Sequence, residues 1–198
     1  MTRRLVLASA SPARLKTLRN AGFDPEVIVS GVDESTVTGP AYDVALTLAV
    51  RKSTAVAARA TDALILGCDS VLELDGEALG KPVDADDAVR RWQRMRGRSG
   101  ILHTGHCLID ALTERSAADV ASTTVQFADL SDAEIEAYVA TGEPLQVAGA
   151  FTVDGLGGPF VERIEGDHHN VVGLSLPLLR QLLADLGYSV TTFWRAGT

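Results

Sequence analysis

The sequence predicts an α/β fold in a single domain, residues 1–198, in which a sheet is flanked by helices. Short apolar runs typical of strands alternate with segments whose apolar residues recur at helical spacing. With 198 residues, 46% of them hydrophobic, the chain is long enough to bury a full core. No internal repeat, low-complexity tract or flexible linker interrupts the alternation, so we expect one unit.

The first expected unit is a strand followed by a helix with clear start signals. We expect a strand over Arg4–Ala8 and a helix over Pro12–Ala21. Ser11 is a good N-cap, and Pro12 suits the first helical turn, where a missing N–H costs nothing. The free N–H groups and the positive end of the helix dipole, with Arg14 beside them, favour phosphate. This unit predicts binding of a phosphorylated small molecule.

The remaining elements follow from periodicity and turn residues. Strands are expected at Pro25–Ser30, Ala63–Gly67, Val71–Leu74, Glu77–Leu79, Gly100–Ile109 and Ala121–Phe127. Helices are expected at Asp43–Ala60, Asp84–Arg96, Ser131–Thr141 and Leu176–Leu186. Asp75-Gly76 is a favoured hairpin turn, and Ser131 and Glu134 have the spacing of a capping box. The glycines of Gly155–Gly158 predict a loop.

Charge, cysteine usage and hydropathy exclude several classes of protein. The formal net charge of -8 argues against binding to a nucleic-acid backbone, which requires clustered Lys and Arg. Cys68 and Cys107 lie in apolar runs, so we expect buried thiols in a reducing compartment. The apolar run Leu5–Ala8 is too short for a secretory signal, and no window approaches the roughly 20 apolar residues of a membrane span. We expect a cytoplasmic protein with no membrane partner.

Three acidic residues are the first candidates for chemistry. Asp69 follows the apolar run Ala63–Gly67, and ligand sites in open α/β sheets gather at the carboxyl ends of strands. A carboxylate there can ligate Mg²⁺ or polarise a water, but it can equally cap a turn with Ser70. Asp33 and Glu34 form an acidic pair in a polar turn, and Mg²⁺ is normally held by one or two carboxylates together with phosphates and waters.

Two lysines and a further aspartate extend this set. Lys81 lies between Gly80 and Pro82, which fix a tight turn. Lys52 lies on an expected helix, where most lysines reach for solvent. Asp154 precedes a glycine, and it can accept N–H bonds from a base edge or simply belong to a turn. Acidic and cationic side chains together are the groups needed for metal-assisted attack of water on a phosphoanhydride.

Other common catalytic and metal-binding patterns are absent from the sequence. It contains neither G-x-S-x-G nor a P-loop, which removes the usual markers of acyl-transfer and kinase chemistry. His103 and His106 have no Cys partner at zinc-site spacing. Adjacent residues of a strand face opposite ways, so we assign His168 and His169 to loop surface instead of a shared metal site.

A set of short motifs, in this order and spacing, resembles the Maf family of nucleoside triphosphate pyrophosphatases over nearly the whole chain. The motifs are Leu7–Pro12 with Arg14, Asp33-Glu34, Ala49–Lys52, Gly67–Val71, Gly80–Pro82, Thr141–Pro144, Ala148-Gly149 and Asn170–Gly173. The resemblance implies a mixed twisted sheet with flanking helices and two lobes around a deep cleft, as in the related inosine triphosphatases. It also implies a homodimer, and cleavage of a nucleoside triphosphate into a nucleoside monophosphate and pyrophosphate with Mg²⁺ or Mn²⁺.

The resemblance also implies roles for individual residues. Asp69 corresponds to a catalytic proton acceptor, and Glu34 and Asp69 would lie near the divalent cation. The triphosphate would be bound by four residues, Ser9, Arg14, Lys52 and Lys81. Asp154 would contact the base. A general-base role and a metal-ligand role for Asp69 both remain open.

The substrate base stays open because the chain departs from two known patterns. Members acting on dTTP and UTP usually carry Arg, Lys and Gln at the positions of Ala13, Val147 and Asp154. Members acting on 7-methyl-GTP more often have an acid at the last position, but tend to have Gln where Ser70 stands. Modified and non-canonical nucleotides, including ITP and XTP, are therefore candidates. The alternative is a nucleotide-binding regulator of cell division without essential catalysis.

Overall fold

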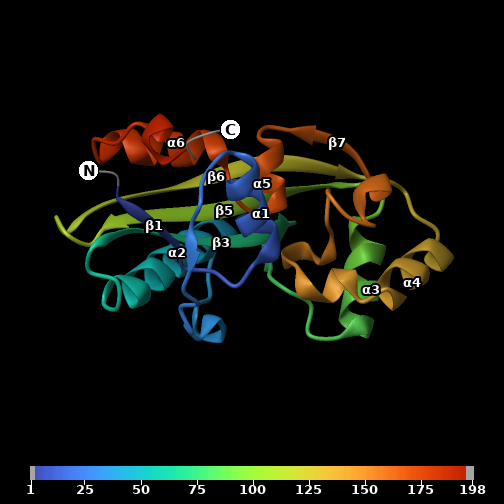
Figure 1. The fold of residues 1–198 in the computed structure, drawn as a ribbon. Helices are drawn as coiled ribbons and strands as arrows, with labels where there is room; N and C mark the ends of the chain where they lie inside the picture. The colour runs from blue at the N-terminus through green and yellow to red at the C-terminus, as the bar shows by residue number, and fades with distance from the viewer. Residues whose placement is uncertain (1–2, 195–198) are drawn as a thin grey trace.

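A mixed seven-stranded sheet runs through the molecule (Figure 1). The computed structural model describes residues 3–194. The strands are β1 (Arg4–Leu7), β2 (Glu26–Val27), β3 (Ala63–Leu74), β4 (Glu77–Leu79), β5 (Ser99–Asp110), β6 (Arg115–Phe127) and β7 (Val161–Glu165). Their order is β2-β1-β3-β5-β6-β7, with β4 paired to β3. β1 is parallel to β2 and β3, and the remaining pairs are antiparallel.

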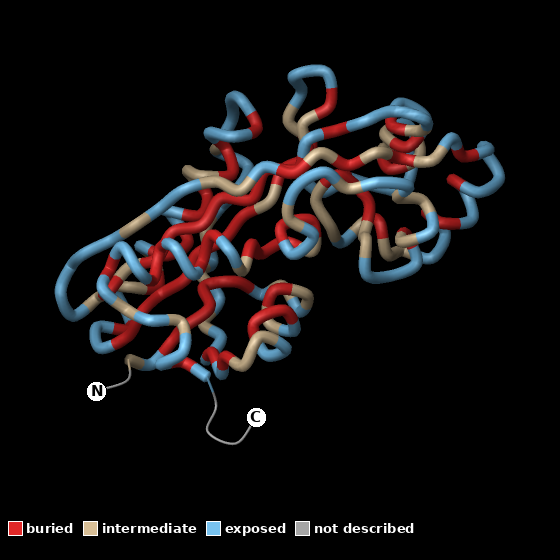
Figure 2. The backbone as a smooth tube through the Cα atoms, turned by 90° about the horizontal axis from the view of Figure 1, so that it is seen from above, coloured by how far each residue is buried: buried red, intermediate tan, exposed pale blue. Residues whose placement is uncertain are grey.

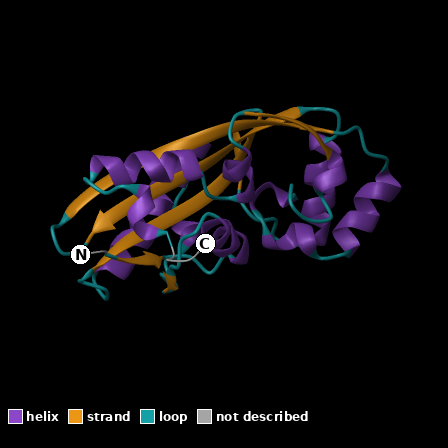
Figure 3. Cartoon of the chain, turned by 45° about the horizontal axis from the view of Figure 1, so that its top comes forward, coloured by secondary structure: helices purple, strands orange, loops and turns teal. Residues whose placement is uncertain are grey.

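Helices cover both faces of the sheet (Figures 1 and 3). The α-helices are α1 (Pro12–Asn20), α2 (Ala41–Ala57), α3 (Ala85–Met95), α4 (Asp132–Ala140), α5 (His168–Val172) and α6 (Leu176–Asp185). Short 3₁₀ helices are η1 (Glu34–Thr36), η2 (Glu143–Gln146), η3 (Ala148–Ala150), η4 (Gly158–Phe160) and η5 (Val190–Phe193). Successive side chains of β3 point to opposite faces of the sheet. Leu64 packs in the core beneath α6, and Ile65 packs in the core beneath α2.

The core divides into a part at each end of the long strands. Leu66 of β3 belongs to the cluster that includes residues of α1 and α6, whereas Leu74 of the same strand packs with Trp92 of α3 and Tyr138 of α4. Figure 2 shows buried backbone running along the strands between the two ends of the molecule. The predicted α/β fold, with a mixed sheet and flanking helices, is confirmed, and β3 contributes to both lobes.

One expected break in the sheet does not exist. The predicted strands Ala63–Gly67 and Val71–Leu74 are one continuous strand, because β5 pairs with it in register from Leu64 to Glu73. Asp69 therefore lies inside β3, and its prediction as the residue that follows a strand is wrong. The strand that ends nearby is β1, whose parallel ladder with β3 reaches only Leu66.

The cysteines, two histidines and the helix lengths bear on three smaller predictions. Cys68 and Cys107 are buried free thiols, as expected, and burial raises the pKa of Cys68 to about 12. His168 and His169 are exposed as predicted, but they form the start of α5 and not a loop. Within residues 3–194, no helix is both long enough and apolar enough to cross a membrane.

Candidate active site

Two glycines of the sheet allow α2 to lie very close to it. A Cβ atom at Gly67 of β3 would stand 2.3 Å from the carbonyl oxygen of Ala49, and one at Gly105 of β5 would stand 2.2 Å from that of Ala45. Real Cβ atoms do not approach backbone this closely, so any larger residue would push the helix away. The close approach presses the next turn of α2, which carries Lys52, against β3.

Lys52 lies between two carboxylates. Its Nζ atom is 2.5 Å from Oδ1 of Asp69 and 2.6 Å from Oε1 of Glu34. Lys52 and Asp69 are only 6% and 7% exposed, whereas the side chain of Glu34, at the start of η1, is half exposed. Three predicted site residues, distant in the sequence, thus meet at one point.

The two carboxylates differ in their affinity for a proton. Burial raises the pKa of Asp69 above its ordinary value, and this outweighs the lowering by the charges of Lys52 and Arg14. Burial also raises the pKa of Glu34, but its bond to Lys52 and the charges of Lys52, Lys81 and Arg14 together bring it below the ordinary value. Glu34 therefore favours the charged form, while Asp69 holds a proton more readily than an ordinary aspartate does.

Arg14 is a buried cation with neutral hydrogen-bond partners. Its Nε donates to the carbonyl of Gly173 (2.7 Å), and Nη1 donates to Oγ of Ser9 (3.0 Å) and to the carbonyl of Cys68 (2.9 Å). Nη2 donates to Oγ of Ser70 (2.9 Å). All four of these partners are uncharged oxygen atoms, so the guanidinium is oriented without a carboxylate bonded to it.

The start of α1 has the predicted cap. Oγ of Ser11 accepts a bond from the backbone N–H of Arg14, and Pro12 is the first helical residue. The N–H of Ser11 donates to Oγ of Ser9 at 3.2 Å, and Ser9 is buried. The positive end of the helix dipole and the Arg14 guanidinium therefore act in the same region, which favours an anion.

Lys81 and Asp33 occupy more exposed positions. Lys81 is exposed, yet its charge contributes to lowering the pKa of Glu34, so it acts on the same region. Asp33 caps η1, where its carboxylate accepts bonds from the N–H and the hydroxyl of Ser35. These bonds lower the pKa of Asp33 and direct its carboxylate toward its own turn.

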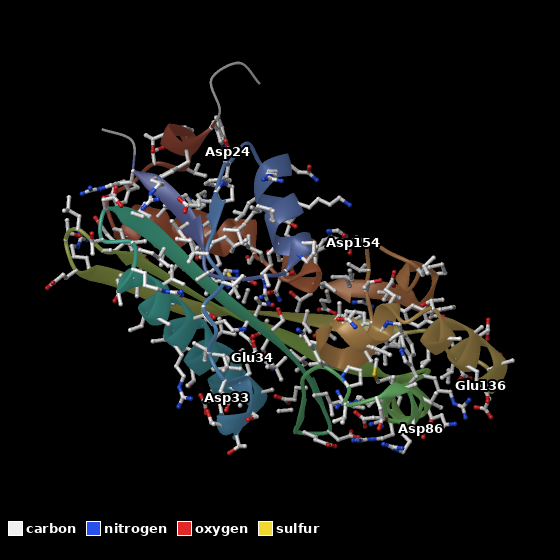
Figure 4. The ribbon with its side chains drawn as sticks, turned by 60° about the horizontal axis from the view of Figure 1, so that its bottom comes forward. Asp24, Asp33, Glu34, Asp86, Glu136 and Asp154 are labelled. Atoms are coloured by element: carbon white, nitrogen blue, oxygen red, sulfur yellow. The ribbon has the colours of Figure 1, made fainter. Side chains whose placement is uncertain are left out.

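Asp154 lies apart from the Lys52 contacts. It lines a cavity of about 280 Å³ between α1 and α5; the other lining residues are Lys16, Thr17, Asn20, Ala21, His168, His169, Val172 and Leu176. In Figure 4, Asp154 lies beside α1, away from the η1 turn that carries Glu34. Helix α1 relates the two places: Lys16 lines the cavity, and the charge of Arg14, on the same helix, opposes the rise that burial causes in the pKa of Asp69 and of Glu34.

Glu143 holds together a loop next to the candidate site, a role that its residue type and position in the sequence did not predict. Its carboxylate accepts four bonds, from the hydroxyls of Tyr138 (2.9 Å) and Thr152 (2.6 Å) and from the backbone N–H groups of Leu156 (3.0 Å) and Gly157 (3.1 Å). These bonds fix the loop that carries Asp154. The only signal in the sequence was its place in the Thr141–Pro144 motif.

The donor chemistry of Glu34 and Asp69 fits a magnesium or manganese ion. Carboxylate oxygens are the hard ligands that these ions prefer, and both groups already bind one positive charge. Within residues 3–194 there is no cluster of three or more His, Cys, Asp or Glu side chains that could hold a metal alone. Two carboxylates are nevertheless sufficient when substrate phosphates and waters complete the coordination.

A mixed sheet with a cationic helix start beside paired carboxylates defines a class: an α/β protein whose site favours an anion next to acidic groups. The chain belongs to the family of Maf-like proteins, whose model matches residues 4–186. This match covers every candidate site residue, from Ser9 to Asp154.

Relatives of high identity extend over nearly the whole chain. A nucleoside triphosphate pyrophosphatase of Salinispora tropica is 63% identical, covering 98% of this chain and 89% of the relative. Proteins of the same name from Streptomyces coelicolor and Gloeothece citriformis are 60% and 52% identical, covering 97% and 98% of this chain and 95% and 100% of their own lengths. Among solved structures, the Staphylococcus aureus Ham1 protein has a TM-score of 0.45 at 16% identity, covering 64% of this chain and 73% of its own.

Proposed function

We propose that this protein is a divalent-metal-dependent nucleoside triphosphate pyrophosphatase. Water attacks the α-phosphorus, the bond to the oxygen bridging the α- and β-phosphates breaks, and nucleoside monophosphate and pyrophosphate leave. The observation that carries the proposal is a buried Arg14 with neutral partners, on the helix start beside the Glu34–Lys52–Asp69 contacts. Membership of the Maf-like family, and the shared name of its relatives, support the same activity.

The triphosphate would be held by Ser9, Arg14, Lys52 and Lys81. Oγ of Ser9 accepts bonds from Arg14 and from the N–H of Ser11, so its own hydroxyl hydrogen is left to donate to a phosphate oxygen. Arg14 and Lys81 add positive charge on the side where negative charge develops on the leaving pyrophosphate. Lys52 joins this set because its ammonium group lies at the carboxylates where the phosphates would arrive.

Asp69 and Glu34 would carry the chemical step. The raised pKa of Asp69 suits a group that accepts the proton of the attacking water. Glu34 and Asp69 are also the residues that would hold the divalent cation, which supplies neutralisation of phosphate charge when bound. Both functions of Asp69 require its ionised form at the start of the reaction.

The base would enter the cavity that Asp154 lines. A carboxylate can accept two N–H bonds from a base edge, and about 280 Å³ is room for a base with part of its sugar. A polar group left unmatched in such a pocket rejects a wrong substrate strongly. The same proposal includes the homodimer that the family resemblance implies, which sedimentation of the purified protein would test.

The decisive experiment compares Asp69→Asn with Asp33→Asn on a panel of triphosphates with Mg²⁺ or Mn²⁺. The panel contains the canonical nucleotides, 7-methyl-GTP, ITP and XTP, with monophosphate and pyrophosphate as the readout. We expect Asp69→Asn to lower turnover at least about 100-fold with the fold intact. Asp33→Asn is the comparison: it weakens the cap of η1 beside Glu34 but leaves Asp69 and Lys52 in place, so we expect a much smaller loss of turnover.

Two outcomes would contradict the proposal. If Asp69→Asn released pyrophosphate at the unmutated rate, the catalytic assignment would be wrong. Tight binding of nucleotides with hydrolysis of none would favour the alternative, a nucleotide-binding regulator.

A further inference from the structure

A chain of hydrogen bonds links the Arg14 guanidinium to the segment that begins α5. Nη2 of Arg14 donates to Oγ of Ser70 at 2.9 Å, and Oγ of Ser70 lies 3.0 Å from Oγ1 of Thr104. Oγ1 of Thr104 in turn donates to the carbonyl of Asn170 at 3.3 Å. We infer that Thr104 is a positioning residue, which acts through Ser70 to hold Arg14 in the orientation that binds phosphate. This inference rests on the proposed function.

The direction of every bond in this chain is determined. A carbonyl can only accept, so the hydroxyl hydrogen of Thr104 points to Asn170. Thr104 must then accept the hydrogen of Ser70, and Ser70 turns a lone pair to the N–H of Arg14. Without the hydroxyl of Thr104, the hydroxyl of Ser70 can rotate and its alignment with Arg14 is lost.

The far end of the chain is rigidly anchored. Asn170 is fully buried, and its Nδ2 donates to the carbonyl of Leu102 (3.1 Å) and to Oγ1 of Thr123 (3.0 Å). These bonds tie the start of α5 to β5 and β6, the strands that also support Thr104. The acceptor of Thr104 therefore has a fixed position, as a positioning chain requires.

The segment of α5 and the residue after it also contacts Arg14 directly. The carbonyl of Gly173, just after α5, accepts the Nε–H of Arg14 at 2.7 Å. Ser70 holds Nη2, while Ser9 and the carbonyl of Cys68 hold Nη1, so every nitrogen of the planar guanidinium has a partner and Ser70 is the one that orients Nη2. Thr104 is fully buried, so it would act on a bound substrate only through the orientation of Arg14, to which reactions of bound groups are sensitive.

The test compares Thr104→Val with Thr104→Ser, each made in the unmutated protein and in Arg14→Ala. Valine keeps the shape of threonine without the hydroxyl, and serine restores the hydroxyl. We expect Thr104→Val to lower kcat/KM about tenfold, mainly through KM, and Thr104→Ser to stay within about twofold. In Arg14→Ala, adding Thr104→Val should cause no further loss, because there is no guanidinium left to orient.

Thr124→Val is the matched control, since Thr124 follows Thr123 on β6 and faces the other way. Thermal unfolding of each variant separates loss of fold from loss of positioning. An equal loss from Thr104→Val in both backgrounds, or no loss in the active protein, would overturn the inference and leave the proposed function standing. Absence of triphosphate hydrolysis by the unmutated protein would instead overturn the proposed function.

Discussion

At the scale of single residues, the ammonium group of Lys52 determines how the site is charged. It is bonded to Asp69 and Glu34 at once, and it is almost wholly buried. Most helix lysines reach solvent, and local sequence carries no information about which strand lies beneath the helix, so the burial of Lys52 does not follow from its helix alone. Its partners come from β3 and η1, so only the fold brings the three together.

Removing this ammonium should destabilise the protein in a pH-dependent way. Lys52→Met leaves the buried Asp69 beside Glu34 without a directly bonded counter-charge, which we expect to cost about 3 kcal/mol of unfolding free energy at pH 7. The loss should shrink toward pH 5, because the uncompensated carboxylates of the variant take up protons. Urea unfolding at both pH values measures this. Arg51→Met, which removes an exposed neighbouring cation, should change little, and an equal loss from both would refute the account.

Glu143 gives a second prediction at this scale. Burial raises its pKa, but the bonds from Thr152, Leu156, Tyr138 and Gly157 outweigh burial and leave it below the ordinary value. A carboxyl with a lowered pKa stabilises the fold above its ordinary range and loses that contribution as the pH falls. Glu143→Gln should therefore lower stability by about 1–3 kcal/mol at pH 7 and by less near pH 4.

The same variant should also change base selectivity, because the loop with Asp154 would loosen. Thermal unfolding against pH and the triphosphate panel provide the two measurements. Glu136→Gln, an exposed acid of α4, is the control. A stability difference between Glu143→Gln and the unmutated protein that grew toward acid pH would contradict the pKa argument.

At the scale of elements, the sequence predicts where a helix or strand begins or ends only when the residues that determine this are adjacent in the chain. The start of α1 was predicted in detail, since Ser11, Pro12 and Arg14 are adjacent in sequence and the cap needs nothing else. The capping box of α4 is present for the same reason. The polar residues after Gly67 indicated a strand end, but pairing with β5, which is distant in sequence, extends the strand through them.

The contact of α2 with the sheet leads to a further prediction. Gly105→Ala places a Cβ atom 2.2 Å from the carbonyl oxygen of Ala45, so the helix has to move. We expect a loss of about 2 kcal/mol or more in unfolding free energy, together with reduced turnover because Lys52 shifts. Gly80→Ala meets nothing within 4 Å and is the stability control. Equal stability of the two variants would contradict the close approach.

At the scale of the whole molecule, long strands join the two lobes. Leu66 and Leu74 lie on one continuous β3, yet they belong to different core clusters. β5 pairs with β3 along nearly its whole length, so loss of one lobe would disrupt the ladder that supports the other. The single domain expected from the sequence stays a prediction, and the sequence alone could not show that one strand carries both core clusters.

We therefore expect the chain to unfold in a single transition. Leu66→Ala and Leu74→Ala should each cost about 2–5 kcal/mol and shift the same transition, although their side chains lie in different lobes. Far-UV circular dichroism and the change in tryptophan fluorescence as the fully buried Trp92 becomes exposed should give coincident curves. Two separated transitions, each moved by only one of the variants, would show that the lobes unfold independently.

The close contact of α2 with Gly67 and Gly105 also predicts which substitutions related sequences can carry at these two positions. Any single-base change of a glycine codon that replaces the glycine introduces a residue with a Cβ atom. At these two positions that atom would collide with the backbone of α2. Natural variants there should be rare. A relative that carries a larger residue at either position must have shifted its helix outward, and its lysine can no longer be equated with Lys52 by alignment alone.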